Sequence, residues 1–323
     1  MNEAKTIGLV VAPGVTEKLA ESLIDDIPNI LSHQNNNQHD WEVDLVVDPL
    51  TGYAESVGKI FKKIQDYHDK RQWDYVVAIT DLPMFHNERV LALDINKKNG
   101  AAVFSYPAFG WRPVKKRFKN AIVAIINEVH HSEAEKNDYD DNDNVTYAVN
   151  KQFPLSKIEK TEVYLDETGN DHLRYSSNTR SMGMVRLVSG MTFANNPLNM
   201  MASLSNIVAI AFTTGAFGLI FTTMWQMSME FSMWRLFGIS IIAVLGMLLW
   251  IMMSHDLWES VKQSRNKRIT WLYNLTTVMT LFVAIIIYYI ILYTLFLIAE
   301  LVLLPSDFLG QQVGLKGPVG IDL

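Results

Sequence analysis

Several polar and aromatic side chains follow short apolar runs that are typical of β-strands. Asp48 ends the run at 41–47, and Asp81 ends the run at 74–80. Because ligands of open α/β sheets bind beyond the carboxyl ends of the strands, such side chains can line one crevice. The sequence therefore predicts a polar crevice that binds a small molecule or a cation. Its residues are Asp48, Asp81, His86, Tyr106 and Trp111. The alternative is that Asp48 and Asp81 only close turns through their own backbones.

A second motif lies at the end of a helix expected at 114–130, which continues as Glu128-Val129-His130-His131. The zinc-binding helix of zincins reads H-E-x-x-H, with two histidine ligands one turn apart and a glutamate as general base. Glu128 and His131 keep this spacing, but Asn127 stands where the first histidine would be. The motif indicates either a degenerate metal site at Glu128 and His131 or a solvated helix end with adjacent histidines.

The same helix begins with a cluster of cations, which opposes the helix macrodipole. On a domain held at a membrane, anionic lipid headgroups are a natural partner for such a cluster, and a solvated basic face is the alternative. Nucleic acid is not expected, because no aromatic residues alternate with the basic ones. The residues predicted to face the membrane surface are Arg112, Lys115, Lys116, Arg117, Lys119 and, on a later helix, Arg186.

Composition excludes several chemistries. The chain has no cysteine, so disulfides, thiolate zinc sites and cysteine nucleophiles are ruled out. Most of the net charge of −6 comes from an acidic stretch at 132–145, so no global field attracts nucleic acid. Neither G-x-G-x-x-G nor the phosphate-binding P-loop motif is present, and the cofactor is unknown. The first apolar run is short and closes at Pro13-Gly14, so we expect a strand there and no signal peptide.

These candidate residues must be positioned by an α/β domain. Apolar runs alternate with segments of helical periodicity in the order β-α-β-α-β-β-β-α, which predicts a three-layer domain with a mainly parallel sheet. The expected strands are 6–11, 41–47, 74–80, 90–95 and 101–106, and the expected helices are 16–31, 57–67 and 114–130.

A different organisation is expected after residue 131. The acidic residues suggest a linker, followed by a small β-hairpin of strands 161–166 and 171–175. Residues 182–193 place apolar side chains on one helical face, which indicates either a helix at the membrane surface or a helix packed on the hairpin. The predicted boundaries are 1–131 for the α/β domain, 132–160 for the linker, 161–197 for hairpin and helix, 198–304 for membrane helices and 305–323 for a C-terminal tail.

Three long, nearly uncharged apolar runs lie between residues 199 and 304. They predict membrane spans at 201–225, 234–253 and 271–293, each with the roughly 20 residues that a bilayer requires. The third run continues to 304, which is too long for one perpendicular span. We expect it to break near Tyr293, where a tyrosine cluster suits the headgroup region, and to continue as a surface or re-entrant segment containing Glu300.

Charge in the connecting loops predicts the orientation. Lys262, Arg265, Lys267 and Arg268 lie between the second and third spans, so the positive-inside rule places this loop and the N-terminal domain in the cytoplasm. Three crossings then place the C-terminus outside. Small residues in the first two spans favour close helix packing within the hairpin, with a dimer seam as the alternative. The absence of an ionisable residue in the middle of a span argues against an ion-coupled transporter.

Five segments carry a resemblance to a known family: IGLVVAPG at 7–14, VVDPLTG at 46–52, ITDLP at 79–83, MVRLV at 184–188 and ANNP at 194–197. In these segments the chain resembles an uncharacterised family of bacterial membrane proteins, which joins an α/β domain to C-terminal spans. Some members carry an automatic label of methylenetetrahydrofolate dehydrogenase. Members often have a further apolar segment after the region of Pro305, so the resemblance implies a shortened form.

The sequence contains no complete catalytic motif, so we expect binding in preference to catalysis. The leading hypothesis is a multi-pass protein of the cell membrane, with the bilayer as one partner and a cytoplasmic α/β domain that binds a small molecule or a protein. One alternative is a membrane-anchored enzyme, either a degenerate zincin-like hydrolase or a folate-type dehydrogenase. A second alternative is a structural subunit that assembles through the small residues of its spans.

Overall fold

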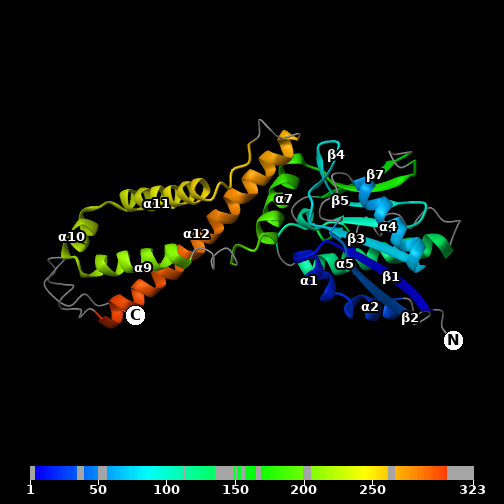
Figure 1. Cartoon of the computed structure of the whole chain (residues 1–323), viewed down its shortest axis with the longest axis horizontal. Coiled ribbons are helices and arrows are strands. Elements are labelled where there is room, and N and C mark those ends of the chain that lie inside the picture. Colours follow the sequence, from blue (N-terminus) through cyan, green and yellow to red (C-terminus); the bar gives the residue numbers. More distant parts are fainter. Residues whose placement is uncertain are drawn as a thin grey trace. The chain divides into compact units, whose positions relative to one another are not determined.

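The computed structural model describes residues 4–34, 40–49, 57–111, 114–134, 149, 151–153, 157–164, 169–198, 205–260 and 266–303 (Figure 1). The chain divides into two compact units, Met1–Ala194 and Asn195–Leu323. Each unit has its own secondary structure and is considered by itself below.

The first unit contains every strand of the described residues. Its elements are β1 (Ala4–Val11), α1 (Val15–Glu21), α2 (Asp26–Gln34), β2 (Asp40–Val47), α4 (Val57–Arg71), β3 (Tyr75–Thr80), β4 (Met84–His86), β5 (Arg89–Asn96), β6 (Ala102–Ser105), the 3-10 helix η1 (Tyr106–Phe109), α5 (Val114–Ala134), β7 (Ile158–Val163), β8 (His172–Ser177) and α7 (Arg180–Ala194).

One eight-stranded sheet organises this unit, in the order β2-β1-β3-β6-β5-β8-β7, with β4 paired to β5. The first four strands of this order are parallel, whereas every pairing of β4, β5, β7 and β8 is antiparallel. The predicted α/β sheet is therefore present, and it is a mixed sheet. β3 is buried at every position, as expected for a strand covered on both faces.

The hairpin of β7 and β8 belongs to this main sheet and does not form a separate element. Its strand β8 pairs with β5 along Leu91–Asn96, opposite Ser176 to His172. An open edge of β5 would leave a row of backbone groups unpaired, and the hairpin satisfies them. Part of the predicted linker also joins this unit, because Val149 and Phe153 are buried within it. Residues 135–148 of that linker lie outside the described residues.

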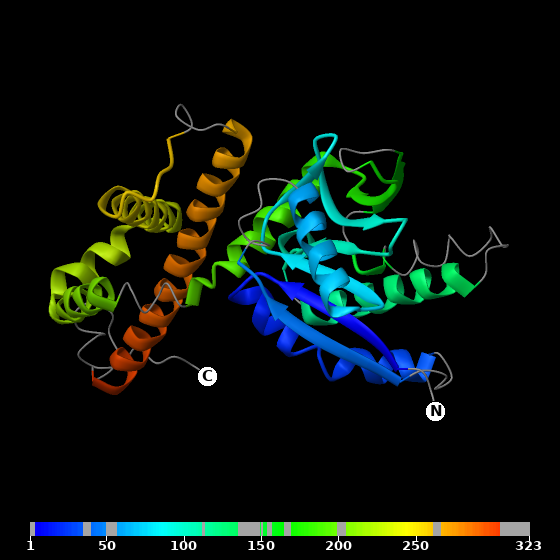
Figure 2. The ribbon, with the colours of Figure 1, turned by 45° about the vertical axis from the view of Figure 1, so that its right-hand side comes forward.

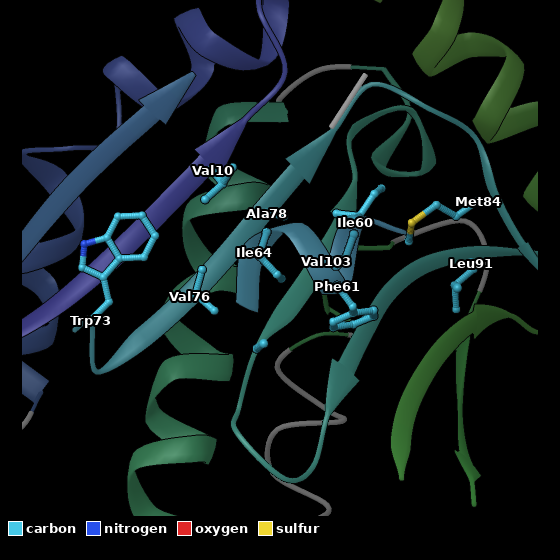
Figure 3. Packing of buried hydrophobic residues seen from close by; sticks show 11 residues of the cluster. Val10, Ile60, Phe61, Ile64, Trp73, Val76, Ala78, Met84, Leu91 and Val103 are labelled. Carbon is cyan, nitrogen blue, oxygen red and sulfur yellow. The ribbon is translucent and has the colours of Figure 1, made fainter. Parts of the chain in front are cut away.

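Helices cover both faces of the parallel strands. α4 lies on one face, and α1, α2 and α5 lie on the other (Figures 1 and 2). Figure 3 shows Ile60, Phe61 and Ile64 of α4 over buried side chains of β3 and β6. Trp73, just before β3, extends this cluster across β1 at Gly8, where an added Cβ would lie 2.0 Å from the indole ring. The three-layer arrangement follows from this division of the helices.

α7 packs against the sheet. Its buried residues include Leu187, Val188 and Met191, which form the apolar face recognised in the sequence. Gly190 allows a close approach to η1, because an added Cβ would lie 2.1 Å from the carbonyl oxygen of Pro107. Of the two interpretations of residues 182–193, the structure therefore supports a helix packed on the domain, since its apolar face is already covered by protein.

The second unit is helical where it is described, with α9 (Ser205–Ile220), α10 (Thr222–Glu230), α11 (Met233–Ser254) and α12 (Lys267–Leu303). The first expected span is interrupted, because Phe221 has an extended conformation between α9 and α10. The third apolar run also differs from the prediction, because a break was expected there and a continuous helix is found. α12 is one helix of 37 residues without the expected break at Tyr293, since the tyrosines there do not disturb backbone hydrogen bonding.

Two helices of this unit, Met233–Ser254 and Lys267–Glu300, are long and apolar enough to cross a membrane by length and composition. Leu248, Ile251 and Met252 of α11 pack against Leu281, Ile285 and Tyr288 of α12. The connection between them is fastened by Asn274, whose amide accepts from the backbone N–H of Glu259 and donates to its carbonyl, both at 2.9 Å. Both the donor and the acceptor group of this buried amide are thus bonded near the start of the long helix.

Candidate functional site

The parallel half of the sheet has a point at which the strand order reverses. β1 lies between β2 and β3, so the chain leaves β1 toward one side and returns through α4 to the other. Val11 at the end of β1 is in register with Val47 of β2 and with Ile79 of β3. The carboxyl ends of these strands therefore meet at one edge. In doubly wound sheets this topological switch point is where ligands bind.

Two of the predicted residues lie at this edge. Asp48 follows β2 and Asp81 follows β3, so β1 separates them, and two strand spacings put them roughly 10 Å apart. They flank the turn that follows β1 and do not share one ligand atom. Gly14 in that turn has φ of +95°, and no atom of the described residues lies within 4 Å of where its Cβ would be.

Asp48 is a buried carboxylate with protein partners. It accepts a hydrogen bond of 2.7 Å from the Tyr67 hydroxyl and lies 3.4 Å from the Lys63 ammonium, both on α4. The bond to Asp48 also raises the pKa of Tyr67, because the neutral phenol is the donor. Asp48 therefore fixes α4 to the end of β2. This structural role differs from the turn closure considered as the alternative, because the partners are side chains of another helix.

Asp81 differs from Asp48 in having no such partner. Within the described part of the chain its carboxylate has no ion pair, and its hydrogen bond is to its own backbone. Surrounding protein atoms remove part of its hydration and raise the pKa of Asp81, although the residue as a whole is exposed. The loop that carries it is fixed, because Leu82 donates to the Thr80 hydroxyl and accepts from the Ser105 hydroxyl. Asp81 thus carries an unpaired carboxylate on a loop that hydrogen bonds hold in place.

The side chains of the other three predicted residues contact protein elsewhere, although Tyr106 follows the parallel strand β6 at this same edge. Tyr106 is buried and stacks on Phe118, with ring centroids 5.8 Å apart. Trp111 stacks on Phe193 of α7, with centroids 5.0 Å apart. His86 ends β4 and faces Arg174 of β8, at 3.2 Å between Arg174 Nη1 and His86 Nδ1. The crevice predicted from the five residues is therefore reduced to the part around Asp81 and the turn at Gly14.

The antiparallel half holds an ionic network that was not predicted from the sequence. Asp94 of β5 is fully buried, and its two oxygens accept from His172 Nδ1 at 2.8 Å and from Arg174 Nε at 2.9 Å. Arg174 then extends the network to His86. Phe61 of α4 contacts the His172 ring edge to face, at 4.8 Å between centroids. Polar residues at alternate positions of β8 were the only sequence signal for this network, because alternate residues share one face of a strand.

This network determines the protonation state of His86, which lies at its outer end. A guanidinium can only donate, so Nδ1 of His86 accepts from Arg174 and is not protonated. Loss of hydration and the nearby Arg174 charge lower the pKa of His86, with Asp94 opposing them. His86 is therefore held neutral at neutral pH. The network is a support for β4 and β8, and its half-buried end at His86 is the part that solvent reaches.

The remaining predicted sites have the following positions. Glu128 and His131 lie on α5, but their side chains are outside the described residues, as is Arg112. In the part of the chain that the structure describes, no group of three or more histidine, aspartate or glutamate side chains could hold a metal ion.

The basic cluster of α5 is partly used within the domain. Lys119 and Lys115 lie 3.3 and 3.6 Å from the Asp26 carboxylate of α2, and they lower the pKa of Asp26. Arg117 donates to the carbonyl oxygens of Phe109 and Trp111, both at 3.0 Å. These contacts supply the compensation that the macrodipole requires. Binding of anionic lipids by this cluster, including Lys116, stays a prediction.

Comparisons with protein-family models, with curated proteins and with solved structures found no match for this chain.

Proposed function

We propose that this protein is a membrane-anchored binding protein whose α/β domain holds a small ligand at the switch point between β1 and β3. The observation that carries the proposal is the unpaired Asp81 carboxylate, which sits at the end of a fully buried central strand with a raised pKa. A carboxylate that is partly dehydrated without a counter-ion is unfavourable for the free domain. A ligand that supplies the missing partner removes that cost.

The chemistry of the edge indicates the ligand class. Asp81 offers acceptor oxygens, and the other aspartate of this edge, Asp48, already has Lys63 and Tyr67 as partners. The N–H of Gly14 is taken by the carboxylate of Glu17, so the turn after β1 offers no free donor at that position to an anion. The edge therefore favours a ligand with an amine or hydroxyl group over a phosphate.

Membrane anchoring is the second part of the proposal. The lengths and compositions of α11 and α12 support it. Lys262 and Arg265 precede α12, and Lys267 and Arg268 begin it. These cationic residues favour a cytoplasmic position for this connection, and the N-terminal domain then lies on the same side if α9 also crosses. With three crossings the C-terminus lies outside. With two crossings, α9 and α10 would stay at one surface and both ends of the chain would share a side.

The ligand site can be tested on the full chain in a nonionic detergent. A library of amines and polyols is screened for a rise in melting temperature, and each hit is repeated on Asp81→Asn and on Asp66→Asn. Asp66 is an exposed aspartate of α4 and serves as the matched control. We expect hits whose affinity falls about ten-fold or more in Asp81→Asn and stays unchanged in Asp66→Asn. Hits that bind both variants equally would refute this site.

A further inference from the structure

The outward side of α7 carries an apolar stripe. Met182 and Val185 are 53% and 66% exposed, and Phe193 continues the same side of the helix, because residues three or eight positions apart share a helix face. Trp111 stacks on Phe193 and is itself 56% exposed. From Met182 to Phe193 the stripe extends roughly 16 Å along the helix. These four residues, the apolar stripe, form one continuous surface and are not scattered side chains.

The helix that carries the stripe lacks the charged face of a helix that borders water. Among its 15 residues α7 has arginines at 180 and 186 and no acidic residue. Its inner side is buried against the domain through Leu187, Val188 and Met191. A helix that is apolar on both sides is typical of a position covered on both sides. The stripe therefore indicates a second apolar partner, and the absence of acids makes α7 compatible with a negatively charged surface.

The position of the stripe along the chain indicates which partner this is. α7 ends at Ala194, and the apolar helix α9 begins at Ser205. The connection between them, fully extended, reaches at most roughly 40 Å. In the proposed membrane arrangement α9 either crosses the lipid or lies at its surface, so the end of α7 stays close to the bilayer. The stack of Trp111 on Phe193 lies at this end of the helix. A surface tethered so closely binds with a high effective concentration.

The chemistry of the stripe also suits a membrane surface. Tryptophan is enriched where headgroups meet acyl chains, because its ring is apolar and its indole nitrogen is polar. The backbone of Trp111 is held by Arg117 of α5, which donates to its carbonyl oxygen at 3.0 Å. Lys116, the neighbour of Arg117, is exposed. Cations beside an apolar surface are attracted to anionic lipids, which strengthens apolar binding at the interface.

We propose that the apolar stripe binds the surface of the bilayer, with Trp111, Met182 and Val185 at the boundary between headgroups and acyl chains. The first unit then lies against the membrane along α7 and does not hang free on its connection. This inference rests on the proposed membrane anchoring and adds to it the side of the domain that meets the lipid. It does not depend on the ligand site at Asp81.

Quenching by spin-labelled lipid tests this proposal on the full chain. The chain has no cysteine, so Val185→Cys gives a single site for a fluorescent label. The protein is incorporated into nanodiscs of phosphatidylcholine and phosphatidylglycerol that contain a lipid with a spin label near the glycerol. We expect quenching roughly two-fold or more stronger at Val185→Cys than at Asp66→Cys. Asp66 is exposed on α4, which covers the other face of the sheet, since Leu91 packs under α4 and its neighbour Val90 lies against α7.

A second substitution excludes an effect of the label itself. Trp111→Gln, added to the labelled Val185→Cys chain, should remove roughly half of the quenching or more, because it takes away the largest apolar group of the stripe. Tyr164→Gln is the matched control, since Tyr164 is an exposed aromatic residue that follows β7, outside the stripe. It should leave the quenching unchanged. Equal quenching in both variants would overturn the proposal.

Ile242→Cys separates this proposal from membrane anchoring. Ile242 is exposed on α11, so a lipid with its spin label at the end of the acyl chain should quench a label there. Quenching at Ile242 without quenching at Val185 would overturn the contact of the stripe with lipid and leave anchoring intact. Absence of quenching at Ile242 would refute anchoring, and the present inference with it. A label at Val185 that is shielded from iodide in detergent as strongly as in nanodiscs would show that protein covers the stripe, which would also overturn the proposal.

Discussion

Asp94 and His172 lie 78 positions apart in the sequence, yet His172 Nδ1 is 2.8 Å from Asp94 Oδ1 in the interior of the first unit. Both side chains are essentially inaccessible to solvent. The second oxygen of Asp94 accepts from Arg174, so one carboxylate satisfies two donors of β8. The pairing of β8 with β5 is therefore set by charge as well as by backbone hydrogen bonds, and it is the contact that incorporates the hairpin into the sheet.

Replacing Asp94 by asparagine should destabilise the domain by about 3–5 kcal/mol, because it removes the buried carboxylate that accepts from both His172 and Arg174. Urea unfolding followed by circular dichroism measures the loss. Glu88→Gln is the control, since it breaks an exposed ion pair with Arg180 and should cost less than about 1 kcal/mol. Equal effects of the two variants would show that the Asp94 network contributes nothing beyond a surface pair.

Asp81→Asn should stabilise the free protein at neutral pH. The folded-state pKa of Asp81 is raised above the ordinary value of 3.8, so ionisation of this group disfavours the folded state. Below 3.8 the group is protonated in both states and the variant should match wild type. The gain should appear as pH rises above that value and should level off above the folded-state pKa. Melting temperatures across the acidic to neutral range test this, and a variant less stable than wild type at neutral pH would contradict it.

Gly8→Ala should destabilise the first unit by about 1–3 kcal/mol, because the new methyl group would overlap the Trp73 ring. Trp73 also donates from its indole nitrogen to Asp44 at 3.0 Å, so the ring has little freedom to move. Thermal unfolding measures the change. Gly238→Ala, where no atom lies within 4 Å of the added Cβ, is the control and should be close to neutral.

The first turns of α12 should stand outside the lipid. At 1.5 Å per residue its 37 residues span about 55 Å, against about 30 Å for a bilayer core. On α12, the cluster packed against α11 extends from Val278 to Tyr288, and the buried Asn274 holds the connecting loop before that point. The chain has no cysteine, so single cysteines can be introduced cleanly. Trp271→Cys should react with a hydrophilic maleimide at least ten-fold faster than Ile290→Cys. Equal rates would contradict this placement.

Local patterns predicted most of the first unit. The strands at Ala4–Val11 and Tyr75–Thr80 and the helix at Val57–Arg71 follow from apolar runs and helical periodicity, which depend only on neighbouring residues. The expected helix at 16–31 is instead split into α1 and α2. The short strand β4 was missed, since three residues leave no periodic signal.

Long-range pairing could not be predicted in the same way. The acidic stretch suggested that the hairpin stood alone, and nothing local indicates that Arg174 lies opposite Asp94. The same contrast between local signals and long-range contacts applies to the candidate site. Asp48 and Asp81 were placed at the correct sheet edge by their positions after strands, whereas the partners that distinguish them, Lys63 and Tyr67, come from a separate helix.

Alkaline carbonate extraction of membranes from cells that express the full chain tests the central claim most directly. We expect the protein to stay with the membrane pellet, because α11 and α12 cross the lipid and high pH releases only proteins bound at the surface. Recovery of the protein in the soluble fraction would contradict membrane anchoring. It would mean that these helices form the core of a water-soluble assembly.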